Sequence, residues 1–189
     1  MIKVPIEVSA RHIHLSKRDL EKLFGKGYKL TRLKGLSQPG DFAAKETVDI
    51  EAGSRKISNI RIIGPARKET QAELSKTDAI LLGMALPVRN SGDIKKSPGA
   101  VIAGPKNKLA LKCGIINTWR HIHCGFKEAK KFGFKNNMPV SVKTFGNLAV
   151  TFHNVKIRIK KNYKFCLHLD TDEGNAAGIT RTGEGEIII

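Results

Sequence analysis

Residues 10–24 read ARHIHLSKRDLEKLF, and residues 119–132 read WRHIHCGFKEAKKF. Both stretches contain Arg-His-Ile-His, then a short link, then charged residues with periodic apolar ones that indicate a short helix. The second copy follows the first at an offset of 109 residues, as the numbers of His12 and His121 show. A tetrapeptide repeated in this way indicates an internal duplication, so we expect two similar halves.

The segments around the two copies have a mainly β pattern. Apolar residues alternate at Val4, Ile6 and Val8 and again at Val140 and Val142, as in half-buried strands. Turns rich in Gly and Pro separate further short strands, expected near residues 48–50, 57–63, 100–103, 109–116, 148–152, 155–159 and 165–169. Short helices are expected near residues 16–24, 75–82 and 125–132.

These elements predict a mainly β fold with short α-helices, built as two pseudo-repeat β-barrel domains with the active site at their interface. We assign the first barrel to residues 1–110 and the second to residues 111–189. The crossover is expected near residues 93–112, which are rich in Gly, Pro and Lys, and the C-terminal segment could pack back onto the first barrel. Ser16 and Ser75 are the expected N-caps of the first two helices.

The composition is that of an ordinary globular protein, with 40% apolar and 27% charged residues. No stretch approaches the roughly 20 apolar residues of a membrane span, and the first residues lack the apolar core of a secretory signal. Three cysteines, Cys113, Cys124 and Cys166, are an odd number and show no CxxC spacing. We therefore expect a cytoplasmic protein without a disulfide framework and without a membrane partner.

The net charge of +17 results from 34 Lys and Arg against 17 Asp and Glu. A field of this sign attracts polyanions. Nucleic acid is a disfavoured partner, because the lysines are scattered, only 11 residues are aromatic, and no helix-turn-helix, RNP or Cys/His finger pattern occurs. A small phosphorylated ligand would benefit from the same field, and a lysine-rich composition without functional meaning is the other interpretation.

The histidine pairs His12/His14 and His121/His123 are the strongest chemical signal. On a strand, residues i and i+2 point to the same face, so each pair presents two imidazoles side by side. Such pairs commonly hold Zn²⁺, which needs a third protein ligand in a catalytic site. His168, in CLHLDTDEGNAAG, is the next candidate ligand; the alternative is a core histidine bonded to the backbone. His153 is expected on a strand surface.

Glu73, in TQAELS, is the candidate carboxylate ligand. If its segment is extended, Arg67, Glu69, Gln71 and Glu73 point to one face. If the segment begins a helix, Glu73 is a first-turn acid with a capping role only. The residue pattern leaves both alternatives open.

Two arginines and one cysteine complete the candidates. Arg67 follows a Gly-Pro turn and could hold phosphate through two parallel hydrogen bonds. Arg89, followed by an Asn-Ser-Gly sequence that could form an anion-binding nest, is similar, and either arginine could instead be a surface ion-pair partner. Cys124 invites interpretation as a nucleophile, but strand alternation places it on the face opposite to His123, which disfavours that role.

Together these motifs resemble the PduL-type phosphate propanoyltransferases, a metal-dependent phosphotransacylase family. The resemblance covers nearly the whole chain, in order through VSARHIHLS, LSQPGDFAAKETVDI, IRIIGPARKETQAELS, PVRNSGD, RHIH and HLDTDEGNAAGI. It implies reversible transfer in which propanoyl- or acetyl-CoA and phosphate give acyl phosphate and CoA. It also implies a pair of β-barrels with the active site between them and two divalent metal ions, usually zinc.

Carried over motif by motif, the resemblance implies the metal ligands His12, His14, Glu73, His121, His123 and His168. It makes Arg67 the catalytic arginine that contacts phosphate. Weaker transfers place coenzyme A at Val8, Ser9, Ala10, Lys34, Arg61 and Asn175. The implied partners are CoA, inorganic phosphate and acyl phosphate, and the implied assembly is a homodimer.

The sequence departs from the family pattern in two places. Cys-Gly follows the second Arg-His-Ile-His, where relatives more often have Met or Leu and then Ser or Thr, which puts the cap of the next helix in doubt. Members housed in bacterial microcompartments carry an N-terminal extension, whereas this sequence starts almost at its first expected strand, so we do not expect shell association.

Two other functions compete with acyl transfer. A metal-dependent hydrolase of a thioester or phosphorylated substrate could use the same ligands to activate water. A basic nucleic-acid-binding barrel with structural zinc is the non-enzymatic alternative. Because Glu73, Arg67 and His168 have no evident counterparts at the 109-residue offset, we expect one asymmetric composite centre rather than two equivalent ones.

Overall fold

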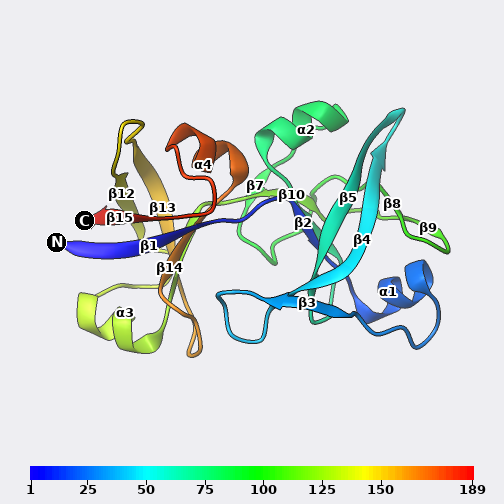
Figure 1. Ribbon diagram of the computed structural model, residues 1–189, viewed down its shortest axis with the longest axis horizontal. Helices are drawn as coiled ribbons and strands as arrows, with labels where there is room; N and C mark the ends of the chain where they lie inside the picture. The colour runs from blue at the N-terminus through cyan, green and yellow to red at the C-terminus, as the bar shows by residue number, and fades with distance from the viewer. The chain divides into compact units, whose positions relative to one another are not determined.

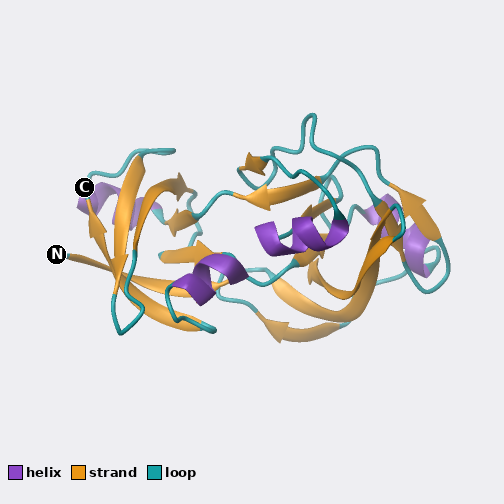
Figure 2. Cartoon of the chain, turned by 90° about the horizontal axis from the view of Figure 1, so that it is seen from above, coloured by secondary structure: helices purple, strands orange, loops and turns teal.

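The computed structural model describes residues 1–189 and consists mainly of β-strands with four short helices, which confirms the expected fold class (Figure 2). The chain forms two compact units. Unit 1 contains Met1–Ala10 and Trp119–Ile189, and unit 2 contains Arg11–Thr118. None of the four helices has the length and apolar character needed to cross a membrane.

Unit 1, which contains both ends of the chain (Figure 1), is a closed six-stranded barrel. Its strand order is β1-β14-β11-β13-β12-β15. Its strands are β1 (Ile2–Val8), β11 (His121–Cys124), β12 (Pro139–Thr144), β13 (Thr151–Ile159), β14 (Cys166–Leu169) and β15 (Thr182–Ile188). Two helices belong to this unit, α3 (Phe126–Phe132) and α4 (Thr171–Ala176).

Unit 2 is a nine-stranded sheet that curls like half a barrel, with the order β7-β10-β6-β2-β5-β4-β8-β9 and β3 paired with β4. Its strands are β2 (His12–His14), β3 (Arg32–Gly35), β4 (Phe42–Ala52), β5 (Arg55–Gly64), β6 (Gln71–Glu73), β7 (Val88–Arg89), β8 (Val101–Ala103), β9 (Lys108–Ala110) and β10 (Ile115–Thr118). The helices are α1 (Lys17–Phe24) and α2 (Lys76–Leu82).

The units differ from the expected division into residues 1–110 and 111–189 because of where two strands pair. Strand β1 precedes the first Arg-His-Ile-His but pairs with β14 and β15 of unit 1. Strand β10 precedes the second copy but pairs with β6 and β7 of unit 2. The chain therefore passes between units directly before each histidine strand, and not near residues 93–112.

The duplication is visible in the strand pairing around each histidine strand. Strand β2 pairs in parallel with β5 and antiparallel with β6. Strand β11 pairs in parallel with β13 and antiparallel with β14. Both histidine strands are therefore central strands with the same pair of neighbours, which fixes the register of their side chains.

Alternation along these strands separates an apolar core face from a polar face. Ile13 and Ala72 are fully buried in the core of unit 2, as Ile122 and Leu167 are in unit 1. The histidines flank the isoleucine of each copy and so project to the other face. The period-two pattern thus directs both His-x-His pairs away from the hydrophobic cores.

The helix caps follow the sequence with one exception. The Ser16 side chain accepts a hydrogen bond from the Asp19 backbone, and the Ser75 side chain accepts one from Asp78, so both expected N-caps are present. Helix α3 begins after Gly125, which provides no side-chain bond. The N-terminus of this helix therefore has no side-chain cap.

Several boundaries differ from expectation, and strands β3, β7 and β15 and helix α4 were not expected. The expected strand 109–116 is two strands, β9 and β10, because the chain turns between them at Gly114, whose φ is +127°. No strand precedes Thr151 within residues 148–150. The polar segment after His168 is helix α4, which Asp170 caps through a capping box with Glu173.

Candidate functional site

His12, His14 and Glu73 form the first group of candidate ligands, in unit 2. One ligand atom from each residue lies within 4.8 Å of the others. The group arises because β6 pairs antiparallel with β2 and places Glu73 directly opposite His12. The Glu73 segment is therefore an extended strand, with the helix starting only at Lys76, and the helical alternative for Glu73 is excluded.

The backbone orients the His14 ring. Its Nδ1 lies 3.1 Å from the carbonyl oxygen of Ile63, an acceptor that fixes the proton on Nδ1 and leaves the Nε2 lone pair for another partner. Burial lowers the pKa of His14 to about 3, and the charges of His12 and Arg67 act in the same direction. A neutral imidazole at physiological pH is the form that binds a metal ion.

Three side chains hold the Glu73 carboxylate. Gln71 Nε2 and Ser91 Oγ each donate to Glu73 Oε1 at 2.6 Å, and Thr118 Oγ1 donates to Oε2 at 2.6 Å. Burial would raise the pKa of Glu73, but the attraction of His12 and His14 and the two hydroxyl donors outweigh it and hold the pKa below its usual range. The group is therefore an ionised, oriented carboxylate.

Arg67 lies beside this first group. Its backbone N–H donates to the Leu15 carbonyl at 2.9 Å, directly after the histidine strand. Its guanidinium is 3.9 Å from Asp41 and close enough to His14 to disfavour protonation of that ring. The side chain is 38% exposed, so it can meet a ligand from solvent.

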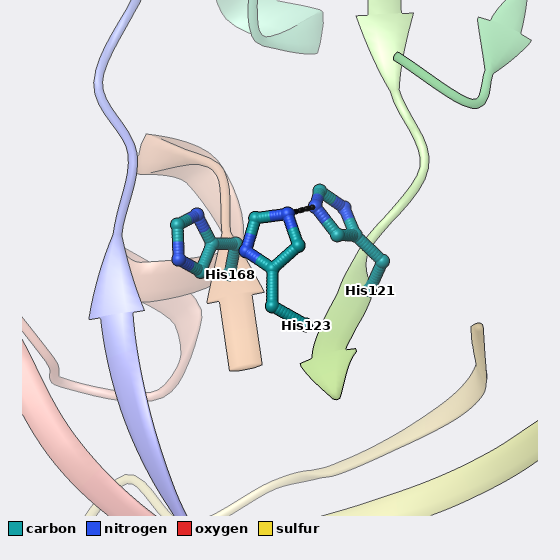
Figure 3. A group of neighbouring side chains, drawn as sticks. All are labelled: His121, His123 and His168. Carbon is teal, nitrogen blue, oxygen red and sulfur yellow. Dashed lines mark hydrogen bonds between the residues drawn. The ribbon is translucent and has the colours of Figure 1, made fainter. Parts of the chain in front are cut away.

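His121, His123 and His168 form the second group, in unit 1, again within 4.8 Å of one another. Strand β14 pairs antiparallel with β11 and places His168 directly opposite His121. Figure 3 shows the three rings close together, with a dashed line joining His121 and His123. Tyr163 packs against His123, with ring centroids 4.2 Å apart.

The spacing of the ring nitrogens in this second group is compatible with shared coordination of a metal ion. His121 Nδ1 lies 2.8 Å from the Trp119 carbonyl oxygen, which directs Nε2 toward the group. The Nε2 atoms of His121 and His123 are 3.1 Å apart. Two imidazole nitrogens on one tetrahedral zinc ion lie about 3.3 Å apart, so the pair needs little movement to bind.

The strand that carries the third ligand continues in the same way in both units. Residues 73–78 read ELSKTD and residues 168–173 read HLDTDE; each begins with the candidate ligand, continues with a buried leucine and ends in a capping box. The arginine of each Arg-His-Ile-His pairs with the last acid of this stretch. Arg11 contacts Asp78 at 2.9 Å, and Arg120 contacts Glu173 at 2.7 Å.

Glu73 and His168 are therefore structural counterparts, contrary to the expectation drawn from the 109-residue offset. Their own offset is 95 residues, because the segment between histidine strand and third ligand is shorter in the second copy. Arg67 has a backbone counterpart as well, since Lys160 N–H donates to the Cys124 carbonyl as Arg67 does to Leu15. The expectation of one composite centre stays a prediction.

The residues suggested for coenzyme A belong to both units. In unit 1, Val8 at the end of β1 lies close to Gly174 of α4, the residue before Asn175: a Cβ added at Gly174 would lie 2.6 Å from the Val8 side chain. Ser9 and Ala10 follow Val8 directly, and the Ser9 backbone donates to Leu169.

In unit 2, Lys34 is exposed on β3, while Arg61 on β5 donates to the carbonyls of Ala44 and Lys45 at 3.0 and 2.7 Å. These bonds give Arg61 a structural role within the sheet. The assignment of the six residues to coenzyme A stays a prediction.

Cys124 lies in the apolar core of unit 1 with no exposed surface. Burial raises its pKa to about 11, and Glu128 adds to the effect. Because the thiolate is the nucleophilic form, a thiol of this kind is inert at neutral pH. His153 is exposed on β13, where it contacts Ser141 at 2.8 Å.

Sequence reasoning missed the role of Thr118 and gave Ser91 only a place in an anion nest. Their contact with Glu73 depends on strands β7 and β10 reaching β6 through long-range pairing. One signal was present for Thr118: at the 109-residue offset it matches Ser9, so a hydroxyl precedes Arg-His-Ile-His by two residues in both copies.

Comparisons with known proteins identify the family of the chain. Residues 5–180 match the model of the family described as phosphate propanoyltransferase. A phosphate propanoyltransferase of Thermotoga maritima is 48% identical over 95% of this chain and 85% of its own length. The protein of that name from Clostridioides difficile is 40% identical over 98% of this chain and 88% of its own.

Proposed function

This chain belongs to the phosphate propanoyltransferase family and is a transferase, and we propose that it exchanges an acyl group between coenzyme A and phosphate with the help of two divalent cations. The reaction joins propanoyl- or acetyl-CoA and inorganic phosphate to give acyl phosphate and free CoA, and it is reversible.

One observation carries the proposal: each unit holds three donor side chains in the same scaffold, and an arginine lies beside the first of them. The donor sets are two imidazoles with a carboxylate and three imidazoles. Three protein donors of these types fit a catalytic zinc ion, which keeps one position for substrate. We therefore assign one cation to His12, His14 and Glu73, and a second to His121, His123 and His168.

A bound cation would supply Lewis acidity toward the thioester carbonyl and toward the departing thiolate. Other residues of the chain orient the ligands. The Ile63 and Trp119 carbonyls hold two of the histidines with Nε2 directed at the donor group. Gln71, Ser91 and Thr118 hold the Glu73 carboxylate ionised and in place. Such outer contacts set the orientation and basicity of ligands.

Arg67 is the residue to which we assign phosphate. Phosphate must approach an electron-rich carbonyl. The negative charge of phosphate therefore has to be offset, and one phosphate oxygen has to be directed at the acyl carbon. The guanidinium is partly exposed, adjoins the first donor group, and has only a long 3.9 Å contact with Asp41 to give up. A planar guanidinium can bind two phosphate oxygens at once.

The transfer is proposed to be direct. Phosphate oxygen forms a bond to the acyl carbon, the bond from that carbon to sulfur breaks, and the electron pair leaves with CoA as its thiolate. A covalent acyl-enzyme on Cys124 is not needed, and burial with a raised pKa makes that thiol unsuitable as a nucleophile.

The test is a product assay with purified protein, propanoyl-CoA or acetyl-CoA, and phosphate. Thiol release should require phosphate and a bound divalent cation, and the acyl group should be recovered as acyl phosphate by trapping with hydroxylamine. Formation of free acid at a rate independent of phosphate would identify a hydrolase instead. Salt-dependent DNA binding without turnover would identify the nucleic-acid alternative.

A further inference from the structure

Five metal-ligating side chains share the polar face of the barrel in unit 1: Glu7, His121, His123, Cys166 and His168. Three pairings bring them together. Glu7 on β1 stands beside His168, His168 stands opposite His121, and Cys166 stands opposite His123. Residues paired in this way project to the same face of a sheet. Only three of the five are used by the proposed function.

The two remaining side chains form a group of their own with His168. One ligand atom each of Glu7, Cys166 and His168 lies within 4.8 Å of the others. Glu7 Oε2 is 3.5 Å from His168 Nε2. Cys166 is only 6% exposed, and its Sγ makes a 3.6 Å contact with the Leu167 carbonyl, a weak bond that a cation can replace.

The equivalent positions of unit 2 lack this second donor set. The counterpart of Cys166 is Gln71, since these residues stand opposite His123 and His14 respectively. The counterpart of Glu7 is Ile116, which stands beside Glu73 as Glu7 stands beside His168. Gln71 orients Glu73, and Ile116 is buried. The shared scaffold therefore does not require a carboxylate and a thiol at these positions.

We propose that Glu7, Cys166 and His168 form a second, sulfur-containing cation site on unit 1, which shares His168 with the three-histidine group. A thiolate, a carboxylate and an imidazole make a donor set for a thiophilic divalent cation of the zinc and cadmium class. On binding, a bond forms between the cation and Sγ, and the thiol proton passes to solvent. This proposal extends beyond acyl transfer and does not depend on it.

Titration of the metal-free protein with Co²⁺ or Cd²⁺ tests the site. A bond from a thiolate to either ion gives a charge-transfer absorption in the ultraviolet, which histidine and carboxylate ligands do not give. The wild-type protein should develop this band as the cation is added. The band should fall to background in Cys166→Ser and weaken in Glu7→Gln.

The other two cysteines supply matched controls. Cys124→Ser changes an equally buried thiol and Cys113→Ser a more exposed one, so both variants should keep the full band. A Cys113→Ser/Cys124→Ser double variant, in which Cys166 is the one remaining thiol, should also keep it, and this variant decides the question if Cys166→Ser does not fold.

Two results would overturn the proposal. One is a wild-type protein that binds the cation without a thiolate band, and the other is a band that survives in Cys166→Ser. Neither bears on acyl transfer, which the product assay measures separately. Conversely, a protein that fails in the product assay can still show the band.

Discussion

Glu73 and His168 occupy the same place in the two halves of this chain, each directly opposite the first histidine of an Arg-His-Ile-His strand. One half thus offers a carboxylate where the other offers an imidazole. The surroundings of the two positions are alike: each is followed by a buried leucine and then by a helix with a capping box. The chain has kept the geometry of the duplication while changing the charge of one donor group.

The first prediction concerns metal content. Purified protein should contain at least two tightly bound divalent cations per chain, one for each donor group of the proposed function, measured by elemental analysis after extensive dialysis. His12→Ala and His121→Ala should each lose one of them, because each removes a ligand from a different group. His153→Ala, which changes an exposed histidine outside both groups, is the control. Equal loss from all three variants would indicate general unfolding, not loss of a specific site.

Arg67→Ala should lower phosphate-dependent turnover by about 100-fold, a typical cost of removing one preorganised electrostatic contact. The loss should appear mainly in the response to phosphate concentration, and Arg67→Lys should recover only part of it because an ammonium cannot bind two oxygens in a plane. The neighbouring Lys68→Ala is a charge-matched control. Normal phosphate saturation in Arg67→Ala would refute the assignment.

Thr118→Val should weaken cation binding at the first group roughly 10–100-fold, because it removes the 2.6 Å bond that holds Glu73 Oε2. Competition with a chelator of known affinity measures the change. Thr118→Ser keeps the hydroxyl and should restore affinity, which a purely structural role of the threonine methyl group would not predict. The affinity of the second group serves as an internal reference and should stay constant.

The stability of the metal-free protein should fall as the pH drops below about 6.5. The folded-state pKa of His14 is lowered to about 3, so between these values the unfolded chain takes up a proton that the folded chain does not. One such group costs at most about 1.4 kcal/mol per pH unit. Urea unfolding at pH 7, 6 and 5 should show a smaller pH dependence in His14→Gln than in wild type. Identical slopes would show that His14 is protonated in the folded state.

Added salt should lower kcat/KM for acyl-CoA and phosphate. The net charge of +17 attracts both anions over distances that salt screens. Steady-state kinetics between low and physiological ionic strength measure the effect, with constant cation loading verified at each salt concentration. A flat response would mean that the basic surface has no part in capturing substrate.

The sequence by itself determined the class of fold and most of the candidate ligands. Period-two alternation requires both histidines of each pair to share a face, and it places Ile13 and Ile122 in the cores and Cys124 away from His123. The serine caps of the first two helices could also be predicted from the sequence, because a capping hydrogen bond joins residues only three positions apart. The repeated Arg-His-Ile-His motif indicated the internal duplication.

Only the tertiary structure decided which partners complete each group. Strand pairing brings Glu73 to His12 and Thr118 to Glu73 across long stretches of chain, and local pattern carries no information about such register. Strand pairing also places β1 in unit 1 and β10 in unit 2. No change in composition along the sequence marks these unit boundaries. The same pairing brought Glu7 beside Cys166 and His168, which share a face of β14 but lie far from Glu7 in the sequence. The sequence shows which side chains could bind a cation. A binding site, however, forms only when several strands pair in the register that brings those side chains together.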